Sequence, residues 1–383
     1  MTAPSSLPAD EPSRLDELLA LYGRAGFERV DPPVLQPADA FLDLSGEEMR
    51  RLMFLTADAE GRELCLRPDI TLPVCRLYLA AGAAGPADYA YLGPVFRSSA
   101  PGGEFLQGGI ESFGRADREA ADAEILALGL ETAALWGVID PVIRLGDVGL
   151  FAALLEALAL PPGWRRRLTK DFARAGSLGA DLAVLRRRPD GGGVTAHAGV
   201  LSALAGSDPE AAHALVTDLL SIAGISTVGG RTVSEIAERF LEQAASGEAE
   251  GLPAEKVALL EAWLAVEGEP DIAAARLRAL AQGAGLRLDA ALDAFEQRTH
   301  FLAAQGVEVG RVHFAAAFGR PLDYYTGMVF ELHPLNGTSE VEPPLVAGGR
   351  YDGLLARLGA ARDIPAVGFA VWPARLAALE AGR

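Results

Sequence analysis

The chain has 383 residues, of which half are apolar and 22% are charged, and its 34 Lys and Arg against 52 Asp and Glu give a formal net charge of −18. Such a length allows two or three domains, and without an apolar run of about 18 residues no segment is expected to span a membrane. A strongly acidic chain is a poor partner for nucleic acid, and a start without a basic or apolar leader predicts a cytoplasmic protein.

The first 150 residues predict helices combined with an antiparallel hairpin. Two strand-like runs flank a loop of Ser, Pro and Gly, which is typical of two strands joined by a flexible tip. In chain order we expect a helix over 13–26, an extended proline-rich segment over 27–37, a helix over 41–54, a helix opening with Arg67-Pro68-Asp69, strands over 89–97 and 107–113, a helix over 117–136 and a strand over 142–148.

The remaining residues predict a helical region followed by a return to strands. Residues 161–286 are rich in Ala, Leu, Arg and Glu at helical spacing, and we interpret them as an insertion. A helix over 288–305 and strands over 312–318, 328–333 and 366–371 follow. The fold class is therefore α+β, an antiparallel sheet flanked by helices, with domain boundaries at 1–160, 161–286 and 287–383.

The cysteines and histidines do not form a recognisable metal or redox motif. Cys65 and Cys75 are the only cysteines, and their spacing argues against a disulfide framework and a structural zinc site. The five histidines are scattered, and no Walker loop, nucleophile elbow or dinucleotide fingerprint is present. We expect no metal, no cofactor and two reduced, buried cysteines.

Four polar clusters interrupt otherwise apolar elements and predict a binding pocket. They are Arg67-Pro-Asp69-Ile-Thr71, Gly93-Pro-Val-Phe-Arg97 with Gln107 and Glu111, Arg320-Pro-Leu-Asp-Tyr324-Tyr325-Thr326, and Gly348-Gly349-Arg350-Tyr351-Asp352-Gly353. Gln107 and Glu111 leave the same face of one strand, where an amide and a carboxylate suit an ammonium group. Arg97 and Arg320 could bind a carboxylate or phosphate, tyrosine hydroxyls a ring nitrogen, and the paired glycines would let a backbone approach a ligand closely. Together they indicate a pocket for a free amino acid.

Each cluster also has a structural interpretation. Asp69 could complement a helix dipole, Tyr324 and Tyr325 could be core aromatics, and Arg97 could pair with Glu111. All four clusters together favour the pocket, because so many inward polar groups would be costly without a ligand.

Four segments resemble, in order and spacing, the catalytic core of class II histidyl-tRNA synthetases. They are LRPDITLPVCRLY, YLGPVFRSSAPGGEFLQGGIESFG, RPLDYYTGMVFELH and VAGGRYDGLLARLGAARDIPAVGFAV. The resemblance covers residues 13–150 and 288–376. It implies a histidine pocket lined by Asp69, Thr71, Gln107, Glu111, Tyr324, Tyr325 and Tyr351, with Arg97 and Arg320 at positions that contact the carboxylate and the ATP α-phosphate. DPPVLQP resembles the class II dimerisation motif and implies a homodimer.

Three departures from the synthetase pattern concern tRNA and ATP. From the length that remains after the matching segments we expect no anticodon-binding domain, and the hairpin loop over 98–106 lacks the basic residues that hold ATP. In the third class II motif, G-F-A-x-G-x-E-R-L, Trp372 replaces a glycine and could occupy the nucleotide site.

A synthetase-like core with these losses resembles the family of ATP phosphoribosyltransferase regulatory subunits, as does the stretch VIRLGDVGLFAALLEALALPPGW. The resemblance implies a chain without catalytic residues. It would bind histidine and control a separate short-form catalytic subunit in a hetero-octamer, at the first step of histidine biosynthesis. Allosteric coupling of this kind is typically about 1–3 kcal/mol.

Two other functions remain open at this point. A stand-alone synthetase paralogue forming histidyl-adenylate would use the retained Arg97, Arg320 and Arg375. An RNA-binding module would use the basic runs over 165–170 and 186–188, which we interpret instead as a solvated helical face or a docking surface.

Overall fold

The computed structural model describes residues 11–42, 51–82, 85–172, 175–186, 253–320, 322–335 and 343–381. By its internal contacts the chain divides into two units, one of residues 1–154 with 262–383 and one of residues 155–261. Each unit is described by itself.

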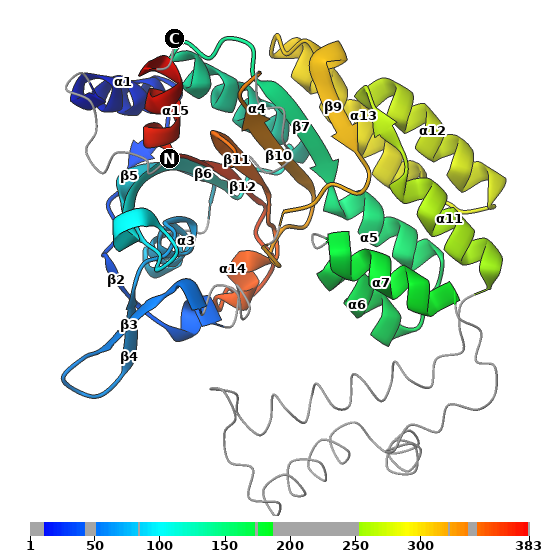
Figure 1. Ribbon diagram of the computed structural model, residues 1–383, viewed down its shortest axis with the longest axis horizontal. Helices are drawn as coiled ribbons and strands as arrows, with labels where there is room; N and C mark the ends of the chain where they lie inside the picture. Colours follow the sequence, from blue (N-terminus) through cyan, green and yellow to red (C-terminus); the bar gives the residue numbers. More distant parts are fainter. Residues whose placement is uncertain are drawn as a thin grey trace, which may run out of the picture. The chain divides into compact units, whose positions relative to one another are not determined.

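A nine-stranded sheet forms the centre of the first unit (Figure 1). Its strands, in spatial order, are β1 (Glu28–Arg29), β5 (Ala87–Phe96), β6 (Glu104–Phe113), β12 (Ala366–Val371), β11 (Val346–Arg350), β10 (Met328–His333), β7 (Val142–Asp147), β9 (Val312–Ala315) and β8 (Glu267–Gly268). The six strands from β5 to β7 in this order are antiparallel to one another. At the margins, β1 runs parallel to β5 and β9 runs parallel to β7. The sheet is therefore mixed at its margins, which corrects the fully antiparallel expectation.

Helices cover the sheet because each has a face of small or apolar residues. On α4 (Arg118–Ala134), Gly129 lies against Phe330 and Val346, so the helix packs closely on β10 and β11. Helix α13 (Asp289–Ala304) packs on α4, and α12 (Pro270–Gly283) packs on α13. The first and last helices, α1 (Glu11–Arg24) and α15 (Pro373–Ala381), lie side by side (Figure 1), and Arg14 pairs with Glu380.

A small antiparallel sheet and two short helices complete this unit. Its strands are β2 (Leu35–Pro37), β4 (Glu63–Leu66) and β3 (Phe54–Ala57), and α3 (Thr71–Ala80) follows β4 directly. Helix α14 (Leu354–Arg357) follows β11, and the 3₁₀ turns lie at Pro101–Gly103 and Val309–Arg311. The predicted helix over 41–54 is thus wrong at its end, because Phe54 begins a strand, and its centre, residues 43–50, lies outside the described residues. Helix α3 begins at Thr71 rather than at Arg67.

The second unit is helical where the structure describes it. Helix α5 (Val148–Ala157) runs into it, and α6 (Pro162–Asp171), α7 (Ala175–Arg186) and α11 (Ala254–Leu264) follow. Arg167 pairs with Asp181, and Lys256 donates to the carbonyl of Leu158 at 2.6 Å. Most of the predicted helical region, residues 187–252, lies outside the described residues.

Across the described ranges, no helix combines the length and apolar character needed to cross a bilayer. The same residues contain no group of three or more His, Cys, Asp or Glu side chains placed to hold a metal ion. Cys65 and Cys75 are buried and free, as predicted.

Candidate functional site

One cavity of about 210 Å³ in the first unit brings together all nine predicted site residues. They come from the start of α3, the hairpin β5–β6, the segment before β10 and the end of β11, and they are Asp69, Thr71, Arg97, Gln107, Glu111, Arg320, Tyr324, Tyr325 and Tyr351. Apolar walls are added by Leu52, Leu322, Ala347, Phe369, Ala370 and Trp372, with Gly368 between them. The four polar clusters therefore converge on one pocket.

Glu111 lies on the floor of the cavity, where it is 1% exposed. The Tyr91 hydroxyl donates to one carboxylate oxygen at 3.2 Å, and the Tyr351 hydroxyl donates to the other. A Cβ on Gly368 would lie 1.9 Å from that second oxygen, so only glycine leaves room for the carboxylate. Burial raises the pKa of Glu111 to about 8, although the hydrogen bonds from Tyr351, Thr71 and Tyr91 oppose the rise.

The second carboxylate, Asp69, precedes α3 and lies beside the same cavity. Its side chain accepts a hydrogen bond from the backbone N–H of Leu72 at 3.2 Å, so Asp69 both caps the start of the helix and lines the cavity. Gln107 accepts from the backbone N–H of Ile70 at 3.1 Å, which ties the floor strand to the start of this helix. Burial raises the pKa of Asp69, and the neighbouring Arg97 limits that rise.

Two arginines, Arg97 and Arg320, also line the cavity. Arg97 donates to the carbonyl of Pro68 at 2.7 Å, and its guanidinium lies 5.4 Å from the Phe105 ring centroid. Arg320 donates to the Tyr325 hydroxyl at 2.6 Å and pairs with Glu331 at 3.2 Å. No hydrogen bond or ion pair joins Arg97 to Glu111 in the described part of the chain, and the carboxylate that interacts with the charge of Arg97 is Asp69.

Trp372 lines the cavity beside these arginines and is 7% exposed. The Arg375 guanidinium lies 4.3 Å from the Trp372 ring centroid, and Arg375 donates to the carbonyl of Pro344. Burial, with like charges at Arg97 and Arg320, lowers the pKa of Arg375 to about 10. A large indole thus lines the cavity together with Arg97 and Arg320 and contacts Arg375.

The tyrosines form an aromatic wall. The Tyr324 and Tyr325 ring centroids are 4.9 Å apart, and Tyr324 meets Tyr351 edge-on at 5.7 Å. This wall contacts a carboxylate and a guanidinium group of the cavity, because the Tyr351 hydroxyl donates to Glu111 and Arg320 donates to the Tyr325 hydroxyl.

Two details differ from the sequence-based expectation. A Cβ on Gly348 would lie 2.1 Å from the Gly368 carbonyl oxygen, and one on Gly349 would lie 2.3 Å from the Met328 carbonyl oxygen. These glycines therefore allow neighbouring strands to approach each other, not a ligand. Sequence reasoning also missed Tyr91, whose alternation with Gly93 and position opposite Gly109 could have placed it on the same face as Glu111.

Comparison with known sequences identifies close relatives. Residues 10–183 and 211–376 match the model of the histidyl-tRNA synthetase family. The ATP phosphoribosyltransferase regulatory subunit of Brucella ovis is 44% identical over 358 residues, which cover 92% of this chain and 93% of that protein. The regulatory subunit of Brucella abortus is likewise 44% identical, over 92% of each chain.

Solved structures show the same fold at lower identity. A protein of Bacillus halodurans described as an ATP phosphoribosyltransferase regulatory subunit/histidyl-tRNA synthetase superposes with a TM-score of 0.66 at 20% identity, covering 98% of this chain and 82% of that one. The histidyl-tRNA synthetase of Nostoc sp. PCC 7120 gives 0.65 at 19% identity, covering 99% and 74%. These similarities confirm the predicted α+β, class II synthetase-like fold.

The sequence relatives show the family of the chain as well as its fold. Their identity to this chain extends over nearly the whole of both proteins, and the match to the synthetase family spans both halves of the core. The chain therefore belongs to the family of ATP phosphoribosyltransferase regulatory subunits, non-catalytic paralogues of histidyl-tRNA synthetase that act in histidine biosynthesis.

Proposed function

We propose that this chain binds free histidine in the cavity and thereby regulates a short-form ATP phosphoribosyltransferase catalytic subunit. The observation that carries the proposal is the presence, in one cavity, of buried carboxylates at Asp69 and Glu111 and guanidinium groups at Arg97 and Arg320. A free amino acid carries both an ammonium and a carboxylate group, so it can pair with the carboxylates and with the guanidinium groups at once.

Individual roles follow from the chemistry of each group. Glu111 and Gln107 receive the ligand ammonium, Arg97 and Arg320 bind its carboxylate, and the tyrosine wall holds the imidazole ring. Asp69 and Thr71 complete the polar side near α3. None of these residues is assigned a catalytic step.

The assembly we propose contains at least two copies of this chain and the catalytic subunit, in the cytoplasm. The dimerisation motif over 31–37 runs into β2, where Leu35 is 51% exposed. Phe54 and Leu55 on β3, which β4 separates from β2 in the same small sheet, are also exposed. Exposed large apolar side chains on one sheet favour an interaction surface there. We further propose that the helical region over 161–286 is an insertion between the two halves of the core.

Mixing this chain with the short-form catalytic subunit should produce a complex larger than either protein alone. Light scattering should show a homodimer for this chain alone and a hetero-oligomer for the mixture, and transferase activity should become more sensitive to histidine in the mixture. Calorimetry with histidine on the same samples provides the binding control. Separate elution at micromolar concentration, together with an unchanged histidine response, would contradict the proposal.

The chain should catalyse little or no histidine-dependent exchange of pyrophosphate into ATP. Trp372 lies among Arg97, Arg320 and Arg375, and the hairpin tip lacks basic residues, so the triphosphate has little room and few cations. A histidyl-tRNA synthetase assayed in parallel is the control. Robust exchange would favour the alternative function, a stand-alone histidine-activating synthetase paralogue.

Histidine binding should release a proton near neutral pH. In the free protein, burial raises the pKa of Glu111 to about 8, so this carboxyl is mostly protonated at pH 7. A ligand ammonium group beside it favours the carboxylate and lowers this pKa, so affinity should increase as the pH rises from 7 to 8. Phosphate and Tris differ in ionisation enthalpy, so the difference between the binding heats measured in the two buffers gives the number of protons released. Identical heats in both buffers would be the contrary result.

A further inference from the structure

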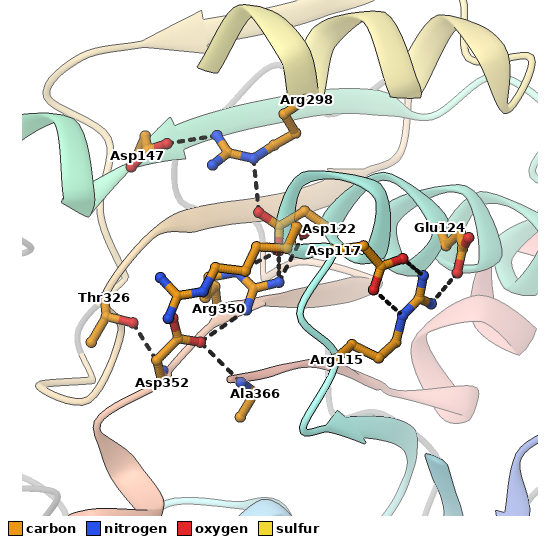
Figure 2. A network of polar contacts seen from close by, with 11 residues as sticks. Arg115, Asp117, Asp122, Glu124, Asp147, Arg298, Thr326, Arg350, Asp352 and Ala366 are labelled. Carbon is orange, nitrogen blue, oxygen red and sulfur yellow. Dashed lines mark hydrogen bonds and ion pairs between the residues drawn. The ribbon is translucent and has the colours of Figure 1, made fainter. Parts of the chain in front are cut away.

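Five charged side chains form a buried network that does not line the cavity. Arg298 on α13 donates to Asp122 on α4 at 2.8 Å and to Asp147 at the end of β7 at 2.6 Å (Figure 2). Arg350 on β11 donates to the other oxygen of Asp122 at 2.8 Å and to Asp352 at 2.9 Å. All five residues are at most 9% exposed.

Such a network has one well-defined arrangement. Each buried charge is costly unless an opposite charge and hydrogen bonds compensate it, so displacing one member leaves another unpaired. The carboxylate of Asp122 forms ion pairs with two arginines from two different elements, and Arg298 forms ion pairs with two carboxylates. The positions of α4, α13, β7 and β11 are therefore linked through these contacts.

The network is directly adjacent in sequence to the cavity at Tyr351. Arg350 and Tyr351 are consecutive, and their side chains go to opposite sides, one to Asp122 on α4 and the other to Glu111 on the cavity floor. The backbone around Tyr351 is held on both sides of the residue. Its N–H donates to the Ala366 carbonyl at 2.8 Å, and Ala366 N–H donates to the Asp352 carboxylate at 2.9 Å.

A second connection reaches the tyrosines that precede β10. Thr326 follows Tyr324 and Tyr325, and its hydroxyl accepts a hydrogen bond from the Asp352 N–H at 2.9 Å (Figure 2). The Thr326 N–H in turn donates to the Arg350 carbonyl at 2.8 Å. The two chain segments that carry the aromatic wall are thus attached to each other and to the network.

We propose that Asp122 and Arg298 are positioning residues for the histidine pocket, acting through Arg350, Asp352 and Thr326 on the tyrosine wall. The inference rests on the proposed function, since it concerns the affinity of the same cavity for histidine. It assigns a role in ligand binding to two side chains that do not line the cavity, one on α4 and one on α13.

The test compares histidine affinity with thermal stability in full-length variants. Asp122→Asn should raise the Kd for histidine at least tenfold, measured by calorimetry well below the melting temperature of each variant. Thr326→Val, which removes an acceptor at an exposed site, should raise the Kd three- to tenfold with little change in melting temperature. Phe295→Leu, buried on α13 but outside the network, is the matched control, with a Kd within twofold of wild type.

The outcomes separate this inference from the proposed function. If wild type binds histidine and both Asp122→Asn and Thr326→Val bind it within twofold of wild type, the positioning role is wrong. If Asp122→Asn does not fold, Thr326→Val decides between the two results. If wild type itself shows no binding, the proposed function fails, and this inference fails with it.

Discussion

Glu111→Ala is expected to weaken histidine binding more than tenfold, which corresponds to a loss above about 1.5 kcal/mol. The bound ammonium would lose its buried charged acceptor, and water cannot replace that acceptor well in an enclosed cavity. Two tyrosine hydroxyls, those of Tyr91 and Tyr351, would lose the same acceptor. Calorimetry with histidine on the purified chain measures the effect.

Controls separate the loss of charge from the loss of shape. Glu111→Gln keeps an acceptor of the same size and should lie between wild type and Glu111→Ala in affinity. Glu104→Ala, at the exposed start of the same strand, should bind as wild type does. Wild-type affinity in Glu111→Ala would remove Glu111 from the binding site.

Arg298→Met is expected to reduce the free energy of unfolding by about 3–5 kcal/mol. The substitution leaves the carboxylates of Asp122 and Asp147 buried with one cation fewer, and both are at most 5% exposed. Urea unfolding followed by circular dichroism gives the value. Combining it with Asp147→Asn should recover part of the loss, because one of the unpaired charges is then removed.

The matched control lies on the helix packed against α13. Arg278→Met on α12 removes a cation that pairs with Asp289, Asp293 and Glu296 near the surface. Solvent screens such pairs, so the expected loss is below about 1 kcal/mol. Equal losses for Arg278→Met and Arg298→Met would contradict the importance of burial for the network.

Local patterns in the sequence predicted most of the strands and helices that surround the cavity, but not β11, which contributes Ala347 to its lining. Strands β10 and β12 have the predicted ends, because short, mainly apolar runs that contain Val and Phe predict buried strands. The same two-residue period placed Gln107 and Glu111 on one face of β6, and both line the cavity. Helices α4 and α13 followed from their apolar spacing, and the motif resemblance implied that the ligand is histidine.

Tertiary structure alone decided which groups meet. Glu111 and Tyr351 are 240 positions apart, and Arg350 and Asp122 are 228 apart, so no local period contains their pairing. Because of the strand order, Gly348 lies where two neighbouring strands approach closely, and the Tyr91 hydroxyl lies within hydrogen-bond distance of the Glu111 carboxylate. Composition and periodicity determine whether a side chain faces the interior, whereas its partner, and hence the pKa near 8 of Glu111, depends on which segments the sheet places side by side.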